Sequence, residues 1–141
     1  MKIKLLFGML FPTMLFAQSI KVPTGFSVAE IAKNQGATRH ITVSKDGHIY
    51  AKLSKLKDGN GIVQLKDVNQ DGVFESETLF GNYPGTGIMI DGEYFYASSN
   101  KGVFRYALNA KGEIADLNTF ETIVDGLPDH GRDNAKPFVF D

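Results

Sequence analysis

The chain of 141 residues contains no cysteine. This absence excludes disulfide bonds, thiolate metal sites and a cysteine nucleophile, and it also excludes a lipid anchor attached to a cysteine. An excess of charge of one sign is missing as well, because 15 basic and 16 acidic residues nearly cancel. No cluster of lysine and arginine provides a footprint for phosphates, so the composition predicts no nucleic-acid partner.

A hydrophobic run long enough to span a bilayer is also absent. The apolar run from Leu5 to Phe16 is about a dozen residues, whereas a membrane-spanning helix needs about 20. A basic start, Met1–Lys4, precedes this run and Ala17 follows it, which is the order found in a signal peptide. We therefore expect residues 1–17 to be removed and the product to be periplasmic or secreted. The alternative is a buried N-terminal segment.

Glycine and phenylalanine are abundant, with 15 and 11 residues. This composition fits an all-β chain with many tight turns. Segments of alternating hydrophobicity are separated by short turns, which predicts antiparallel strands. After a first alternating segment over 26–32, the expected strands are 40–43, 48–53, 61–65, 73–80, 87–90, 93–98, 102–108 and 120–124.

The strand pattern repeats once along the chain. The turn Asp46-Gly47 has a counterpart in Asp91-Gly92, 45 residues later. A four-stranded repeat of about 40 to 50 residues is typical of a β-propeller blade. The sequence therefore predicts an all-β propeller with two four-stranded antiparallel blades, over 38–81 and 85–126, and a third that begins near 137. Because closed propellers carry at least four blades, we expect 18–141 to be the N-terminal part of a truncated propeller, or a chain that needs partner chains.

An acidic loop, Asp67–Gly72, lies between two expected strands of the first unit. Oxygen-bearing side chains at every second position can converge on one hard cation, and Gly72 permits the reversal. The candidate Ca²⁺ ligands are Asp67, Asn69, Asp71 and Glu75. The twelfth position of the loop is Thr78, so the loop is not an EF-hand, which needs a glutamate there. The alternative is an ordinary turn with solvated carboxylates.

A second candidate site lies between the second and third units, at Asp129 and His130. A histidine beside a carboxylate on a connection between blades can act as a general base. The alternative is a polar surface loop without a catalytic role. We expect His40 and His48 to lie on the blade surface and not to bind a ligand.

Several short motifs occur in a characteristic order. They are Val22–Val28, Thr38–Ile41, Gly61–Asp67 with its acidic loop, Gly85–Ile88, Val124–Pro128 and His130–Arg132. Their order resembles the bacterial glucose/sorbosone dehydrogenase family, propeller enzymes that use pyrroloquinoline quinone (PQQ). The resemblance implies that His130 takes the proton from a sugar hydroxyl while hydride passes to the quinone, and that Asp129 helps to set the basicity of His130.

One residue departs from the pattern of that family. Its aldose dehydrogenases place glutamine or glutamate near Gly85–Gly87, in contact with the cofactor, and this chain has Thr86. The departure favours the sorbosone-like branch or a member that has lost quinone binding. The cationic residues that clamp the quinone come from later blades in the family.

Three functions follow from these observations. The first is the N-terminal part of an exported PQQ-dependent sugar or aldehyde dehydrogenase, with the short chain alone inactive. The alternative is a non-catalytic exported propeller that binds carbohydrate or protein. A third hypothesis is a Ca²⁺-dependent lactonase-type propeller.

Overall fold

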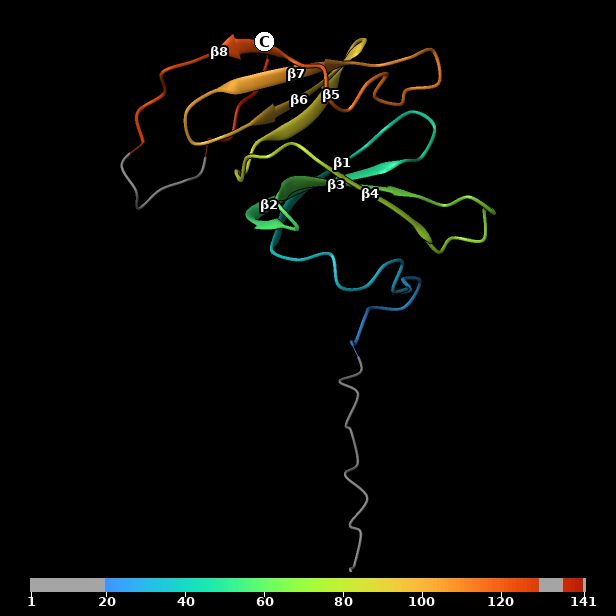
Figure 1. Ribbon diagram of the computed structural model, residues 1–141. Coiled ribbons are helices and arrows are strands. Elements are labelled where there is room, and N and C mark those ends of the chain that lie inside the picture. Colours follow the sequence, from blue (N-terminus) through green and yellow to red (C-terminus); the bar gives the residue numbers. More distant parts are fainter. Residues whose placement is uncertain (1–19, 130–135, 141) are drawn as a thin grey trace, which may run out of the picture.

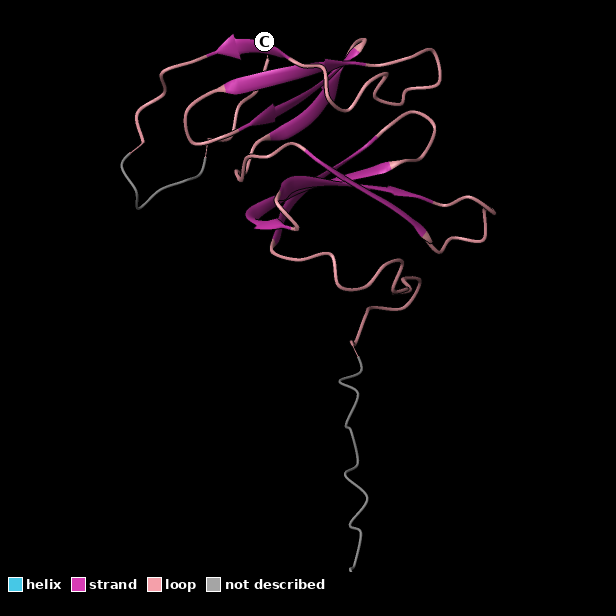
Figure 2. Cartoon of the chain, viewed as in Figure 1, coloured by secondary structure: helices cyan, strands magenta, loops and turns pink. Residues whose placement is uncertain are grey.

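The computed structural model describes residues 20–129 and 136–140. The predicted signal peptide and His130 lie outside this part of the chain. The described residues form eight strands joined by turns and loops, and Figure 2 draws no helix among them. It follows that none of the described residues belong to a helix long and apolar enough to cross a membrane. The strands are β1 (Thr38–Val43), β2 (Ile49–Lys57), β3 (Asn60–Lys66), β4 (Ser76–Phe80), β5 (Ile88–Asp91), β6 (Tyr94–Ser98), β7 (Val103–Ala107) and β8 (Glu121–Val124).

The strands form two separate four-stranded sheets, in the order β1-β2-β3-β4 and β5-β6-β7-β8 (Figure 1). Every neighbouring pair within a sheet is antiparallel. Each strand therefore pairs with the strand next to it in the sequence, which is the meander of a propeller blade. The prediction of an all-β fold with two four-stranded antiparallel blades is confirmed. We call β1–β4 blade 1 and β5–β8 blade 2.

The two Asp-Gly turns close the first hairpin of each blade. Gly47 has a φ of 84° and Gly92 a φ of 55°. Because only glycine adopts such angles without steric cost, these turns reverse the chain tightly at equivalent points of the two blades. The expected strand over 73–80 begins later, at Ser76. Its first residues belong to the acidic loop, where the Glu75 carboxylate accepts a hydrogen bond from Val68 N at 3.1 Å.

The main hydrophobic core lies between the two blades. The alternation of β2 directs Tyr50 toward blade 2, and that of β6 directs Phe95 toward blade 1; their rings are 4.8 Å apart. Phe80 and Tyr106 complete a group of aromatic rings in edge-to-face and tilted contact, with centroids 5.5 Å apart. Aromatic rings bury a large apolar area each and favour such angles. The blades are therefore held together by packing of their faces.

The opposite face of blade 1 has a smaller core and only partial cover. Ala51, Leu53, Val63 and Leu65 are buried there, and Ala32 from the N-terminal segment packs against them. Phe74 N donates a hydrogen bond to Ile31 O at 3.0 Å. The prediction of a strand near 26–32 is nevertheless wrong. These residues form an extended segment that lacks the ladder of hydrogen bonds from a neighbouring strand.

The far face of blade 2 is covered in part by residues 136–140. Tyr96 contacts Phe138 and Phe140, with ring centroids 6.5 and 4.6 Å apart. Ser98 Oγ donates to Lys136 O at 2.7 Å. No strand is assigned within 136–140. This segment lies against blade 2 on the side that faces away from blade 1.

Candidate functional site

The loops of the two blades gather at two ends, because antiparallel strands alternate in direction. We call one the link end: it carries the connection between the blades (81–87), the β2–β3 and β6–β7 turns, and residues 125–129 after β8. The other is the hairpin end, with the Asp-Gly hairpins and the β3–β4 and β7–β8 loops. Figure 1 shows these two sets on opposite sides of the sheets. The two predicted sites therefore lie at different ends of the blades.

Asp129 lies at the link end. It lines a small hollow of about 230 Å³ together with residues of the blade connection and the β6–β7 turn. The others are Asn82, Tyr83, Pro84, Ser99, Asn100 and Lys101. Leu127 N donates to Lys101 O at 2.8 Å, which ties the segment before Asp129 to that turn. The predicted partner of Asp129, His130, is outside the described residues, so the geometry of the pair stays a prediction.

The blade connection is packed closely against both blades. Gly85 N donates to Leu53 O at 3.0 Å. A Cβ atom on Gly85 would lie 2.2 Å from Ser98 O, and one on Gly61 would lie 1.9 Å from Tyr83 O. Both positions therefore require glycine to bring backbone against backbone. Thr86 follows Gly85 and is buried, at 8% exposure.

A buried lysine lies beneath this connection. Lys52 has no exposed surface, and its Nζ donates to Tyr83 O at 2.7 Å. Nζ also lies 4.1 Å from the centroid of the Tyr83 ring, which favours the charged form through a cation–π contact. No carboxylate among the described residues pairs with it. Burial without a counter-ion lowers the pKa of Lys52 from 10.5 to about 7.

The acidic loop at the hairpin end brings three of the four predicted ligands together. One carboxylate oxygen each from Asp67, Asp71 and Glu75 lies within 4.8 Å of the others. Backbone N–H groups hold these side chains in place: Gly72 N donates to Asp67 Oδ2 at 2.8 Å, and Val73 N to Asp71 Oδ1 at 2.8 Å. The fourth predicted ligand, Asn69, contacts Asp71 through its Nδ2, at 3.1 Å from Asp71 Oδ2.

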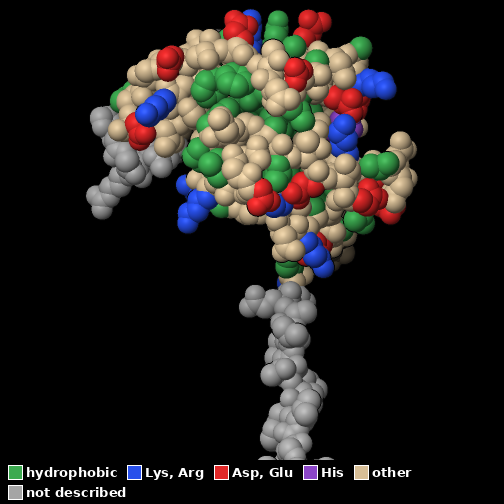
Figure 3. Space-filling model, viewed as in Figure 1, with side chains coloured by type: hydrophobic (Ala, Val, Ile, Leu, Met, Phe, Trp, Pro, Cys, Tyr) green, Lys and Arg blue, Asp and Glu red, His purple; other side chains and the backbone are tan. Residues whose placement is uncertain are grey.

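The charge of this loop is unbalanced within the described part of the chain. Among the described residues, no ion pair includes Asp67, Asp71 or Glu75. Figure 3 shows Asp and Glu side chains on the side of the molecule where the β3–β4 loop projects. Three carboxylates this close repel one another, and a divalent cation would relieve that repulsion. The donor set is all oxygen, which suits Ca²⁺ more than a softer metal.

The structure also reveals a polar cluster that the sequence did not predict. Lys66 Nζ lies 2.7 Å from Glu113 Oε1, and His48 Nε2 lies 3.8 Å from the same oxygen. The hydrogen bond from Lys66 lowers the pKa of the Glu113 carboxyl. This cluster joins the β7–β8 loop of blade 2 to blade 1. Its members are far apart in the sequence, so no local pattern could have found it.

Two solved structures resemble this one. The chain superposes on the holo form of the PQQ domain of pyranose dehydrogenase from Coprinopsis cinerea with a TM-score of 0.66 and 19% identity, covering 83% of this chain and 28% of that domain. It superposes on the calcium structure of a Trichoderma reesei member of carbohydrate-active enzyme family AA12 with a TM-score of 0.54 and 22% identity, covering 70% and 25%. The chain thus spans less than a third of the length of either protein.

The sequence itself matches no protein-family model and no curated protein. The likeness to the two structures concerns the fold, because the identities are below 25%. Together with the two four-stranded antiparallel sheets, it identifies the architecture as two blades of a β-propeller of the kind found in PQQ domains.

Proposed function

We propose that this chain forms two blades of an exported PQQ-dependent sugar or aldehyde dehydrogenase of the bacterial glucose/sorbosone type. The observation that carries the proposal is the position of Asp129. It lines a hollow at the link end of a propeller whose fold is that of a pyranose dehydrogenase PQQ domain. Export rests on the signal-peptide pattern of residues 1–17. Two blades cannot close a ring, so the proposed activity is that of a ring completed by further blades.

The chemistry assigned to this chain is proton transfer at the link end. His130 accepts the proton of a sugar hydroxyl, and Asp129 orients and polarises the imidazole. The bound quinone would supply the hydride acceptor. The described link end does not fit the quinone by itself, because PQQ carries three carboxylates and Lys101 is the one basic residue that lines the hollow. We therefore assign no quinone contact to the described residues. Further blades would supply the cationic residues that bind the quinone carboxylates.

A second candidate function is a non-catalytic propeller that binds carbohydrate or protein. Two observations favour it: Thr86 stands where aldose dehydrogenases have glutamine or glutamate, and the described link end lacks a set of cations. This function needs neither a base nor a quinone. The two candidates differ in whether the completed ring oxidises sugar.

A dye-reduction assay with added PQQ and Ca²⁺ separates the two candidates. It should be run on the 141-residue chain and on a protein in which the same segment is part of a complete ring. We expect sugar-dependent dye reduction from the complete ring and none from the short chain, because two blades provide only one wall of a quinone site. A complete ring that binds PQQ but reduces no dye would contradict the dehydrogenase, and an active short chain would contradict the need for further blades.

We also propose that Ca²⁺ binds Asp67, Asn69, Asp71 and Glu75. The convergence of three carboxylates supports this, as does the calcium present in the similar AA12 structure. Because the loop is at the hairpin end and Asp129 is at the link end, a cation here would stabilise blade 1 and would not contact the substrate. Its role would be structural.

Calcium should raise the melting temperature of the 141-residue chain. A ligand present at 100 times its Kd and bound only by the folded state contributes about 2.7 kcal/mol, which corresponds to roughly 10 °C for a domain of this size. The measurement compares thermal melts in about 5 mM Ca²⁺ and in chelator, with the ionic strength of the two solutions matched. Asp71→Asn keeps the shape of the side chain and should abolish most of the shift.

The matched control for this melt is Asp91→Asn, in the Asp-Gly turn that closes the first hairpin of blade 2 and lies outside the acidic loop. It should leave the calcium shift unchanged. If neither the parent chain nor the Asp91→Asn variant is stabilised by Ca²⁺, the loop is a plain turn.

A further inference from the structure

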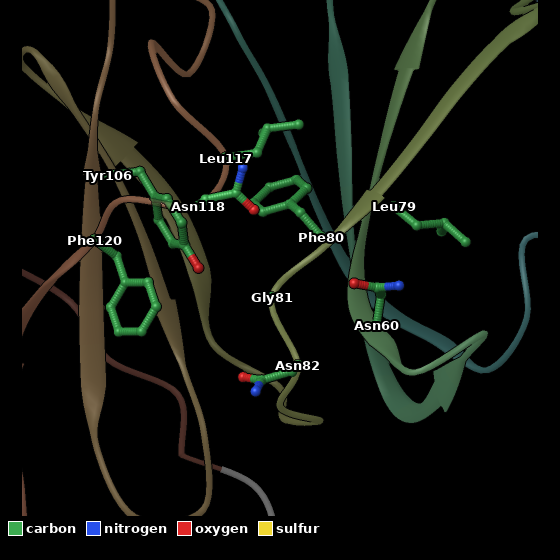
Figure 4. Close-up of a pocket in the computed structure, with 9 residues that line it drawn as sticks. All are labelled: Asn60, Leu79, Phe80, Gly81, Asn82, Tyr106, Leu117, Asn118 and Phe120. Atoms are coloured by element: carbon green, nitrogen blue, oxygen red, sulfur yellow. The ribbon is translucent and has the colours of Figure 1, made fainter.

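A groove runs between the two blades and borders the hollow that contains Asp129, because Asn82 lines both. Its volume is about 530 Å³, within the range of about 300 to 1,000 Å³ typical of small-molecule sites. In Figure 4 one wall carries Tyr106 and Phe120 and the other Asn60, with Gly81 and Asn82 between them. The lining residues are Asn60, Leu79, Phe80, Gly81, Asn82, Tyr106, Leu117, Asn118 and Phe120.

No charged side chain is among the described residues that line the groove. A phosphate, a carboxylate or an ammonium group would lose its hydration there without gaining a counter-ion. Three side-chain amides, from Asn60, Asn82 and Asn118, provide the polarity instead. Each amide offers both donors and an acceptor, which matches a hydroxyl group, since a hydroxyl also donates and accepts. The groove therefore favours a neutral, hydroxyl-rich ligand.

An aromatic ring is exposed at the same wall. Phe120 is 45% exposed, although its ring is held by Phe104 and Tyr106 at centroid distances of 5.2 and 5.6 Å. Packing on one side orders the ring and leaves surface open to the solvent. An aromatic ring can pack against the C–H bonds on the face of a ring that carries polar groups at its rim. Because the aromatic side chain is already ordered, this contact costs little conformational entropy.

The polar groups of the groove have capacity left for a ligand. The side chain of Asn82 makes no hydrogen bond within the described residues, and it is exposed. Asn60 uses Nδ2 to donate to Asp58 O at 2.8 Å, which orders the amide and leaves its oxygen as an acceptor. Asn118 N donates to Asp116 Oδ1 at 2.9 Å, which fixes the loop that carries this third amide. A bound hydroxyl would therefore meet the unused amide of Asn82 and the free oxygen of the ordered Asn60 amide.

We propose that this groove between the blades is a binding site for a neutral saccharide, with one sugar ring on Phe120 and its hydroxyls on Asn60, Asn82 and Asn118. A sugar ring presents an apolar face and a rim of hydroxyls, which is the combination that the groove offers. Asn82 lines both the groove and the hollow beside Asp129. A saccharide of several units can therefore extend from one to the other. Binding in the groove needs neither a quinone nor a base, so it does not depend on the proposed oxidation.

The test is calorimetric titration of the 141-residue chain with cellohexaose, maltohexaose, mannohexaose and chitohexaose, with hexagalacturonate as the charged comparison. We expect at least one neutral hexasaccharide to bind with a Kd on the order of 1 mM or tighter, and hexagalacturonate to bind at least tenfold more weakly. Asn82→Ala, which removes no side-chain hydrogen bond within the described part of the fold, should weaken binding about fivefold. Phe120→Leu keeps an apolar side chain but removes the aromatic face, and it should weaken binding about tenfold.

Asn34→Gly, which removes an exposed amide of the N-terminal segment at a φ of 59° that glycine adopts freely, is the matched control and should bind as the parent chain does. Thermal melts of each variant separate a loss of binding from a loss of folding. The proposal is overturned if no neutral hexasaccharide binds at 10 mM. It is also overturned if binding is unchanged in both folded groove variants, or if an uncharged hexapeptide of glycine and serine binds as tightly as the saccharides. Sugar oxidation by a complete ring is measured separately, so its absence leaves this result intact.

Discussion

Replacement of His130 by alanine in a complete propeller that contains this segment should lower turnover of the sugar by about 10²- to 10⁴-fold. In the proposed function the hydroxyl proton leaves as the carbon loses hydride, so removal of the proposed base is expected to slow the oxidation step. Quinone affinity should change little, because the proposed function assigns no quinone contact to the described residues. The measurement is dye reduction at saturating sugar, together with a titration of PQQ.

The control for this experiment is His40→Ala, which removes an exposed histidine from β1. It should leave turnover within about twofold of the parent. Asp129→Asn should cost less than His130→Ala, because it weakens the base without removing it. A His130→Ala enzyme with normal turnover would show that another group takes the proton.

Replacement of Lys52 by methionine should stabilise the fold at pH 6–7 and remove much of its dependence on pH. The folded state buries the Lys52 amine without a carboxylate partner among residues 20–129 and 136–140, and burial lowers its pKa to about 7. Replacing a buried, poorly paired charge by an apolar side chain of similar size is often neutral or stabilising by about 1–4 kcal/mol. Denaturant unfolding of the parent and variant chains measures this difference.

The sign of the pH dependence follows from the two pKa values of this lysine. Below about pH 7 the amine is protonated in both the folded and the unfolded state. Between pH 7 and about 10.5 the unfolded state binds more protons, so the free energy of unfolding rises with pH. Each unit of separation is about 1.4 kcal/mol, and we expect the parent to gain on the order of 3 kcal/mol between pH 6 and 9.5.

Lys55→Met is the matched control, because Lys55 is an exposed lysine on the same strand. This variant should keep the pH dependence of the parent, whereas Lys52→Met should lose it. Equal pH dependence in the parent and Lys52→Met chains would mean that Lys52 is charged and well solvated in the folded state. The range ends at pH 9.5 because burial raises the pKa of Tyr50 and Tyr106 from 10.0, so at higher pH the ionisation of these tyrosines in the unfolded state opposes the trend from Lys52.

The sequence predicted the blades because their signals are local. The Asp-Gly turns at Gly47 and Gly92 recur at the blade repeat, and each strand pairs with its neighbour in the chain. The segment over 26–32 showed that alternation alone is insufficient: it has the pattern of a strand but lacks the neighbouring strand that would supply the ladder. The acidic loop was also predictable, because its three carboxylates are only eight residues apart from Asp67 to Glu75.

The sites between the blades could not be predicted in this way. Alternation in a sheet with one solvated face would place Lys52 in water, but both faces of a blade in a propeller are covered by neighbours. The groove is assembled from Asn60, Asn82 and Asn118, which belong to a hairpin, a blade connection and a long loop. Their proximity depends on how the two blades pack, which no single stretch of sequence encodes.

The sequential strand order has a consequence for how the protein acquires its structure. Within each sheet every strand pairs with a strand adjacent to it in the sequence. Pairing therefore does not require a strand from a distant part of the chain. Proteins rich in such local contacts have low contact order and fold fast for a β architecture. During synthesis blade 1 can form while blade 2 is still being made, and the face that carries Tyr50 and Phe80 then serves as a template for the next blade. Until blade 2 covers it, that face exposes aromatic side chains that favour aggregation.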